Sequence, residues 1–366
     1  MGRHPTGIDR VCLAYLQHFG GRSQAVVHHP RYRRILDRKA SAELFTLLSG
    51  PRSGIRRGLL KSILRSAARR KLGGKGRLYL NVGHTGLNDP GFNVWVRGAN
   101  LRPIYFVHDL IPITHPEFCR EGEMARHVSR MSTMLTTGAG VIGNSQATLD
   151  DLAKFGGANH LPSPPSLAAW LGTTERLLPA GSVTTPDRPT FVVLGTIEAR
   201  KNHLMLLQIW ERLIQRFGTA APRLLIIGQR GWECEQVFGL LDNSALLREA
   251  VVELSNCSDE ALAGHLASAR ALLFPSLIEG YGLPLIEALR AGAPVIASDL
   301  PVFREIGEGI PDFLDPLDEA AWEHAIMDYA EPSSLARQSQ LQRLGKYRAP
   351  TWEGHFTKVD AWMEQL

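Results

Sequence analysis

The sequence predicts an α/β chain built from two doubly wound units, and three observations support this. With 366 residues, the chain is long for one α/β domain but suits two of roughly 150 to 200 residues each. In the C-terminal half, short apolar runs alternate with amphipathic helical segments, which is typical of a parallel sheet with helices on both faces. A proline-rich stretch over 161–188 separates the two halves.

The elements of the C-terminal half follow from hydrophobic periodicity. Its helical segments lie at His203–Phe217 and Ser258–Ala269. The apolar runs predict strands at Phe191–Leu194, Leu224–Ile227, Val251–Leu254, Ala271–Phe274 and Pro294–Ala297. Ligands bind such sheets at the carboxyl ends of the strands, so we expect a site in the loops that follow these runs.

The N-terminal half is less regular. Its patterns predict helices at Ile8–Phe19 and Ala147–Phe155, and strands at Leu78–Val82, Ile104–Val107 and Gly140–Ile142. Because the chain opens on a turn and a helix, where such a unit normally begins with a buried strand, we expect the N-terminal sheet to lack its first strand. The predicted division is an N-terminal unit over 1–185, a C-terminal unit over 186–348, and a final helix within 349–366 that packs back on the N-terminal unit.

The composition excludes several classes of protein. With 44% hydrophobic and 21% charged residues, the chain is expected to be globular rather than disordered. Its four cysteines show no CxxC spacing, so they do not indicate a zinc site, a redox dithiol or a disulfide framework. No run approaches the ~18 to 20 apolar residues of a spanning helix, and no apolar signal-peptide core opens the chain. We therefore expect a cytoplasmic protein.

The net charge of +5 is concentrated in one segment. Residues 44–88 contain no acidic residue, and 55–72 within them reads as a basic amphipathic helix. Such a helix suggests adsorption to an anionic leaflet, here the inner face of the cytoplasmic membrane. A helix packed on the sheet and a nucleic-acid surface are the alternatives. Because the segment has no aromatic interleaving or recognition motif, we expect no nucleic-acid partner.

The strongest signal is the run Glu-Gly-Tyr-Gly-Leu-Pro-Leu-Ile-Glu at 279–287, which follows a predicted strand. Gly280 and Gly282 let the backbone approach a ligand closely. Pro284 suits the first position of a helix. A helix N-terminus presents free N–H groups and a positive dipole end, so this turn suits a diphosphate.

Two carboxylates flank that turn. Glu279 is expected in the loop before the helix, and Glu287 in the first helical turn. Carboxylates beside a phosphate site are poorly placed to bind phosphate but well placed to accept hydrogen bonds from sugar hydroxyls. Taken singly, Glu279 would be a solvated loop residue and Glu287 a residue that compensates the helix dipole.

The second signal is Gly-Thr-Ile-Glu-Ala-Arg-Lys-Asn at 195–202, directly after the first predicted strand of the C-terminal unit. Arg200 and Lys201 would bring two cations to the carboxyl end of the strand. Cleavage at an anomeric carbon builds negative charge on a leaving diphosphate, and fixed cations stabilise that charge without a metal. A solvated loop with surface charges is the alternative reading.

In the N-terminal half, His108 and Asp109 immediately follow the strand predicted at Ile104–Val107. If that sheet is parallel, the pair lies at the edge where ligands bind.

Together, the motifs at 195–202 and 279–287 resemble those of the retaining glycosyltransferases of the GT-B fold, family 4. The resemblance is specific over about 190–310 and looser across the N-terminal half. It implies two Rossmann-like doubly wound domains facing a central cleft. The N-terminal domain would serve the acceptor, and the C-terminal domain would bind the nucleotide sugar.

The resemblance also implies a role for each candidate residue. Two catalytic residues are implied, His108 and Glu279. The donor diphosphate would be held by Gly7, Arg200, Lys201 and Leu283, the last through its backbone N–H. The transferred sugar would contact His108, Glu279, Gly280, Tyr281 and Gly282, and the nucleotide ribose would contact Glu287.

The reaction implied is transfer of a sugar, with a leaning to mannose, from a GDP- or UDP-linked donor to a glycan or lipid-linked acceptor in polysaccharide assembly. The nucleotide sugar is a substrate, so no cofactor is expected, and no Asp-x-Asp metal pair stands beside the phosphate site. A dehydrogenase is the competing enzyme, but the chain lacks a G-x-G-x-x-G turn followed by an acidic residue. A noncatalytic sugar-nucleotide-binding or assembly subunit is the other alternative.

Overall fold

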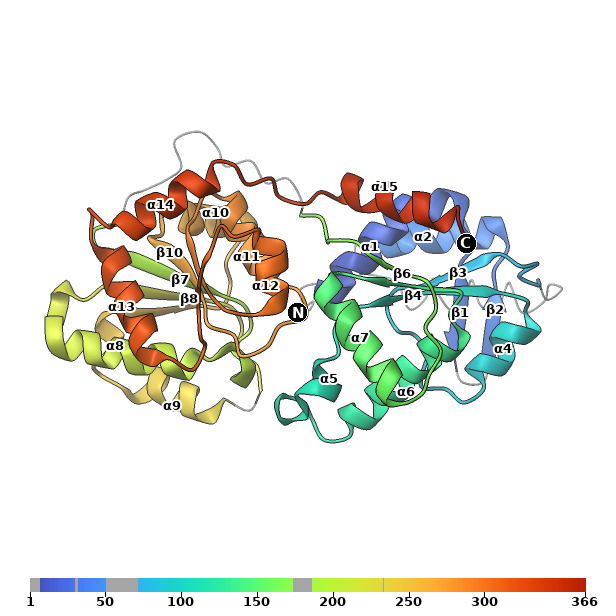
Figure 1. Cartoon of the computed structure of the whole chain (residues 1–366), viewed down its shortest axis with the longest axis horizontal. Coiled ribbons are helices and arrows are strands. Elements are labelled where there is room, and N and C mark those ends of the chain that lie inside the picture. The colour runs from blue at the N-terminus through green and yellow to red at the C-terminus, as the bar shows by residue number, and fades with distance from the viewer. Residues whose placement is uncertain (1–6, 30–31, 51–71, 174–185, 233) are drawn as a thin grey trace. The chain divides into compact units, whose positions relative to one another are not determined.

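The computed structural model describes residues 7–29, 32–50, 72–173, 186–232 and 234–366. Contacts divide the chain into two compact units (Figure 1). Unit 1 comprises Met1–Leu171 and Trp352–Leu366, and unit 2 comprises Gly172–Thr351. The boundary predicted at 185 lies outside the described residues, as does the basic segment 55–72 except for Leu72, which is exposed.

Unit 2 contains one six-stranded sheet, and all of its pairings are parallel. The sheet order is β12-β11-β10-β7-β8-β9. The strands are β7 (Thr190–Leu194), β8 (Arg223–Ile227), β9 (Val251–Leu254), β10 (Ala271–Phe274), β11 (Val295–Ser298) and β12 (Asp312–Leu314). The five strands predicted here are confirmed to within one residue at each end. Sequence reading missed β12 because it is only three residues long and half-buried.

Helices cover both faces of this sheet, as predicted for a doubly wound unit (Figure 1). One face carries α8 (His203–Phe217), α9 (Glu235–Asn243) and α13 (Glu319–Ala330). The other carries α10 (Asp259–Ser268), α11 (Leu283–Arg290) and α12 (Pro301–Gly307), and α14 (Leu335–Leu344) follows α13 along the chain. Single 3-10 turns lie at η3 (Ala199–Lys201), η4 (Gly218–Ala220) and η5 (Leu247–Glu249).

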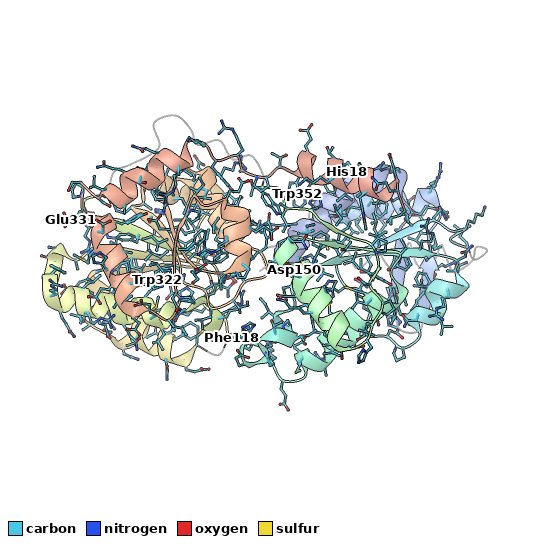
Figure 2. All side chains as sticks on the ribbon, viewed as in Figure 1. His18, Phe118, Asp150, Trp322, Glu331 and Trp352 are labelled. Carbon is cyan, nitrogen blue, oxygen red and sulfur yellow. The ribbon has the colours of Figure 1, made fainter. Side chains whose placement is uncertain are left out.

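Two tryptophans anchor the core between this sheet and the α8 and α13 layer. Trp210 and Trp322 have no exposed surface, and Figure 2 labels Trp322 within unit 2. Each indole N–H donates to a backbone carbonyl, at 2.8 Å to Pro222 and 2.9 Å to Asp315. Both rings therefore bury a large apolar area without leaving a polar group unpaired.

Unit 1 is built on a four-stranded parallel sheet in the order β3-β4-β5-β6, beside a separate antiparallel pair, β1 and β2. The strands are β1 (Val26–His29), β2 (Tyr32–Ile35), β3 (Leu78–Asn81), β4 (Arg102–Val107), β5 (Gly140–Gly143) and β6 (Ser166–Ala168). The helices are α1 (Gly7–Phe19), α2 (Arg38–Ser49), α4 (Phe92–Gly98), α5 (Ile111–Thr114), α6 (Glu123–Thr137), α7 (Gln146–Ala158) and α15 (Trp352–Met363), with 3-10 turns η1 (Gly20–Arg22) and η2 (Pro116–Phe118).

In the described part of unit 1, β3 forms an edge of the parallel sheet. A cavity of about 430 Å³ lies beside it, lined by residues of α1, α2, β1 and β3.

The last helix, α15, packs on α1 within unit 1. The ring of His355, in α15, makes two hydrogen bonds to other parts of unit 1. Its Nε2 accepts from the hydroxyl of Tyr15 in α1 (2.9 Å), and its Nδ1 donates to the carbonyl of Trp170 (3.0 Å). His18 of α1 stacks on Phe356 with ring centroids 4.1 Å apart, and Figure 2 labels His18 and Trp352 on these helices. Over the described ranges, no helix combines the length and apolar character needed to cross a membrane.

Candidate functional site

Arg200 and Lys201 lie in the turn that follows β7. The chain leaves the strand at Gly195, whose φ of +134° favours glycine. It then passes through η3 and enters α8 at Asn202, which has a left-handed φ of +55°. The Asn202 amide donates to the Pro316 carbonyl (2.9 Å), which fixes this geometry. Lys201 is thereby held in the interior, with 8% of its surface exposed.

Glu279 lies against both cations, although it is 78 residues from Lys201 in sequence. One carboxylate oxygen pairs with Arg200 Nη1 at 2.9 Å. The other accepts from Lys201 Nζ and, at 2.8 Å, from the Ser276 hydroxyl. The structure therefore brings together three predicted site residues in one buried ion cluster.

The charge state of this cluster follows from its contacts. Burial by itself would raise the pKa of Glu279, but the charges of Lys201 and Arg200, with hydrogen bonds from Lys201 and Ser276, lower it to about 2. Burial lowers the pKa of Lys201, while the Glu279 charge opposes that shift. At neutral pH Glu279 is a carboxylate whose oxygens are already hydrogen-bonded.

Arg200 also joins the two motif loops through the backbone. Its Nη1 donates to the Ile278 carbonyl at 3.3 Å, and its own carbonyl accepts from the Leu277 N–H at 2.8 Å. Its Nη2 pairs with Glu198 at 3.0 Å. The two cations of the site are therefore matched by two carboxylates, those of Glu198 and Glu279.

The second motif turns into α11 through Gly282, which has φ +117°. A Cβ at this position would lie 2.8 Å from the Phe303 ring, so glycine is required by space as well as by backbone angle. The helix begins at Leu283. Its second residue, Pro284, has no N–H, and the Leu285 N–H already donates to the Gly282 carbonyl at 3.0 Å. Glu287 therefore lies beyond the first turn, which corrects the position predicted for it, because the helix starts before Pro284. It is half-buried.

Gly280 and Tyr281 fill the stretch between Glu279 and Gly282. Gly280 is half-buried, whereas Tyr281 is 6% exposed and belongs to the core. Contact of this stretch with the transferred sugar stays a prediction.

A third loop, after β8, closes on the first. Added to Gly228, a Cβ would overlap the carbonyl oxygen of Gly195, so the two turns touch backbone to backbone. Beyond this contact, Ile197 donates to the Gln229 carbonyl (2.9 Å) and accepts from the Gly231 N–H (3.0 Å). The carboxyl ends of β7, β8 and β10 thus form one continuous backbone surface around the ion cluster.

In unit 1, His108 follows β4 as predicted and is buried, with 7% of its surface exposed. Its Nε2 donates to the Val82 carbonyl (2.8 Å), and its own carbonyl accepts from the Asn144 side chain (2.7 Å). Asp109 accepts from the N–H of Ile111, the first residue of the short helix α5, at 3.1 Å. Burial lowers the pKa of His108, which keeps the ring neutral at pH 7.

Gly7 is the first residue of α1 and is exposed. Gly7 and His108 belong to unit 1, while the other predicted site residues belong to unit 2. Their approach across a cleft stays a prediction. Within the described ranges, no group of three or more His, Cys, Asp or Glu side chains has the geometry to hold a metal ion.

Comparison with known proteins bears on the same region. Residues 188–331, which carry both motifs, match the family described as glycosyl transferases group 1. These residues are similar to a glycosyl transferases group 1 domain. The domain contains the ion cluster, the Gly282 turn and all of α11.

Two curated relatives are mannosyltransferases of Escherichia coli. The serotype-specific mannosyltransferase WbdA is 33% identical over 230 residues, covering 58% of this chain and 28% of WbdA. The O-antigen chain mannosyltransferase B is 31% identical over 167 residues, covering 45% of this chain and 43% of that protein. The chain thus matches under half of the length of either relative.

The likeness to solved structures extends over the whole chain. Anabaena Alr3699/HepE in complex with UDP aligns over 100% of this chain and 98% of its own, with a TM-score of 0.66 and 15% identity. Sucrose-phosphate synthase from Thermosynechococcus elongatus covers 98% of this chain and 93% of its own, with a TM-score of 0.61 and 16% identity. The predicted α/β fold class with parallel sheets, of the GT-B type, is confirmed.

Sequence reading missed three contributors to the site. Ser276 is fully buried and binds Glu279, and Glu198 pairs with Arg200. Gly228 lets the two turns touch. Two of these residues could have been identified from the sequence, because Glu198 lies within the predicted motif and Gly228 directly follows a predicted strand. A single serine ahead of a motif shows no sequence pattern that would identify it as a site residue.

Proposed function

We propose that this chain is a retaining glycosyltransferase that moves a sugar, mannose by preference, from a GDP- or UDP-linked donor to a glycan or lipid-linked acceptor in polysaccharide assembly. The observation that carries the proposal is the buried cluster of Arg200, Lys201 and Glu279 at the carboxyl edge of the group 1 domain. The mannosyltransferase names of the relatives support mannose. The UDP and UDP-glucose complexes of HepE support a nucleotide-sugar donor.

In this scheme, donor binding replaces the carboxylate partner of the two cations with the diphosphate. A diphosphate brings negative charge to Arg200 and Lys201, and it competes with Glu279 for the same N–H groups. A Glu279 oxygen released in this way accepts a hydrogen bond from a sugar hydroxyl. At the N-terminus of α11, the backbone N–H of Leu283 donates to the diphosphate, and Glu287 binds the ribose.

The transfer step uses these groups as fixed charges. As the bond from the anomeric carbon to the diphosphate breaks, Arg200 and Lys201 stabilise the charge that develops on the leaving oxygen. The acceptor oxygen bonds to the anomeric carbon on the same face, and the acceptor proton passes to the departing phosphate. His108 holds a hydroxyl of the transferred sugar. Because no side chain attacks the sugar, a trapped glycosyl-enzyme adduct would count against this path.

The two cations make a divalent metal unnecessary, so we propose a metal-independent enzyme without a cofactor. Turnover is expected to survive excess EDTA. The acceptor is proposed to meet the enzyme at the inner face of the cytoplasmic membrane, with 55–72 as the peripheral contact. No nucleic acid takes part.

Calorimetry against GDP, UDP, GDP-mannose and UDP-glucose tests the donor site. Lys201→Met removes one cation while keeping the length of the side chain, and Lys346→Met in the same unit is the matched control, because Lys346 is exposed. Affinity for the preferred nucleotide sugar is expected to fall by about tenfold or more in Lys201→Met alone, since charge-assisted contacts of this kind are worth about 1.5 to 3 kcal/mol.

Turnover with a mannosylated lipid-linked acceptor then separates the alternatives. Binding without turnover, under any acceptor tested, would favour a noncatalytic sugar-nucleotide-binding subunit. Equal affinities of the two lysine variants would reject the proposed donor site.

A further inference from the structure

Two histidines in unit 1 each form a hydrogen bond to the backbone of the loop that carries the other. His84 follows β3, and His108 follows β4. His84 Nε2 bonds to the carbonyl of Phe106, two residues before His108, at 2.8 Å. His108 Nε2 bonds to the carbonyl of Val82, two residues before His84, also at 2.8 Å. The two rings lie side by side, with centroids 5.2 Å apart.

These bonds fix the proton on each ring. A carbonyl oxygen only accepts, so Nε2 must carry the hydrogen in both histidines. Burial, followed by the charge of His108, lowers the pKa of His84 to about 3. Burial also lowers the pKa of His108. Both rings are therefore neutral at pH 7, and each Nδ1 presents a lone pair that accepts a hydrogen bond.

Neither of these two lone pairs has a partner within the described residues. The buried polar atoms that lack partners include Nδ1 of His127 but not Nδ1 of His84 or of His108, so both of the latter retain some access to solvent. Two acceptors on rings whose centroids are 5.2 Å apart suit a ligand with two donor groups, such as the hydroxyls of a sugar. It repels phosphates and carboxylates, whose oxygens are acceptors too.

The loops are rigid enough to hold this pair. His84 has a left-handed φ of +59°. The Asn81 side chain braces the same turn by accepting from the Thr85 N–H (3.1 Å) and donating to the Thr85 carbonyl (2.9 Å). On the other loop, His127 donates to the Asp109 carbonyl at 3.0 Å. Each acceptor nitrogen is thus held by hydrogen bonds made before any ligand binds.

We propose that His84 is a further sugar-binding residue, and that its Nδ1 and that of His108 accept hydrogen bonds from two hydroxyls of the same transferred sugar. This inference rests on the proposed function, because it assumes that His108 meets that sugar. It assigns to His84 a direct contact with substrate rather than only the support of the neighbouring loop.

Two substitutions of His84 distinguish a direct contact with the sugar from support of the neighbouring loop. The amide of glutamine reaches about as far as Nε2, so His84→Gln can keep the bond to Phe106 while removing the Nδ1 acceptor. The amide of asparagine reaches about as far as Nδ1, so His84→Asn can keep an acceptor there while losing that bond. His160→Gln is the matched control, because His160 is an exposed histidine of unit 1 with a similar left-handed φ of +53°.

Turnover and calorimetry with GDP-mannose and GDP give the readout. We expect His84→Gln to lower kcat/KM by about tenfold relative to His160→Gln, the loss of one good hydrogen bond. Affinity for GDP, which has no sugar to transfer, should not change, and His84→Asn should retain more activity than His84→Gln. The reverse order of the two variants, or a matching loss with GDP, would make His84 a structural residue and overturn the inference.

Nitrogen NMR of the parent protein provides an independent check. Nδ1 should be the unprotonated nitrogen in both rings, and its resonance should move when GDP-mannose is added but not when GDP is added. A protonated Nδ1 on His84 rejects the inference whatever the kinetics. A parent that binds no nucleotide sugar would reject the proposed function instead, while a binding parent with unaltered His84 variants would reject this inference alone.

Discussion

Arg200 is shared between two carboxylates, and this sharing sets the charge of the donor site. Glu279 accepts at 2.9 Å and Glu198 at 3.0 Å, while Lys201 adds a second bond to Glu279. Glu279 is the more deeply placed, with 8% of its side chain exposed against 24% for Glu198. A diphosphate bound to Arg200 therefore competes with Glu198 as well as with Glu279, and displacing the more exposed Glu198 costs less in desolvation.

Replacing Glu198 tests this competition. In Glu198→Gln the neutral amide no longer holds Arg200 as a counter-charge, so GDP or UDP should bind about threefold more tightly, in line with the value of a partly exposed ion pair. Calorimetry at low and physiological salt measures the change, and Glu235→Gln on the exposed start of α9 is the control. Weaker binding would instead mean that Glu198 mainly orients Arg200.

At the scale of single elements, α11 depends on the turn that starts it. Gly282 combines a φ of +117° with a ring of Phe303 where a side chain would stand. The same residue opens the helix whose first N–H, that of Leu283, is proposed to meet the diphosphate. Glycine at position 282 therefore serves both the fold and the proposed diphosphate site.

Gly282→Ala is expected to destabilise unit 2 by about 2 kcal/mol or more, because the added methyl is strained in backbone angle and in space. Gly264→Ala in α10 is the matched control, since the space around Gly264 is open and alanine favours a helix. Urea unfolding followed by tryptophan fluorescence compares the two variants. Similar midpoints for both would contradict the strain assigned to Gly282.

At the scale of the whole molecule, buried histidines couple stability to pH. Burial lowers the pKa of His84 to about 3 and those of His203 and His355 to about 4. The ordinary value in an unfolded chain is about 6.5, so below that pH the unfolded state binds more protons. Their contribution is complete above about pH 6.5 and is lost as the pH falls toward 4. Glu279, with a folded pKa of about 2, acts only in a lower window.

Calorimetric scans should therefore show a Tm that falls between pH 7.5 and pH 5. His203→Leu should flatten the slope and raise Tm, because both ring nitrogens of His203 are buried without a hydrogen-bond partner among the described residues. His160→Gln, at an exposed position, should leave the slope unchanged. A Tm that is constant over this range would show that these rings are already solvated in the folded protein.

The sequence by itself determined the class of fold and the two loops that carry the donor site. Strands such as Ala271–Phe274 are continuous apolar runs, and a strand buried on both faces requires that pattern whatever surrounds it. Arg200, Lys201 and Glu279 could be named because each lies in a short motif directly after a strand. The parallel topology then places such loops at one edge of the sheet.

Tertiary structure alone decided which partners these residues have. The Glu279 carboxylate meets Lys201 from 78 positions away, and His84 and His108 exchange bonds across two loops. Neither pairing leaves a local pattern, because a hydrogen bond depends on the register of neighbouring strands and not on spacing along the chain. Ser276 and Gly228 are site residues for the same reason. The fold places Ser276 against Glu279 and Gly228 against the backbone of Gly195.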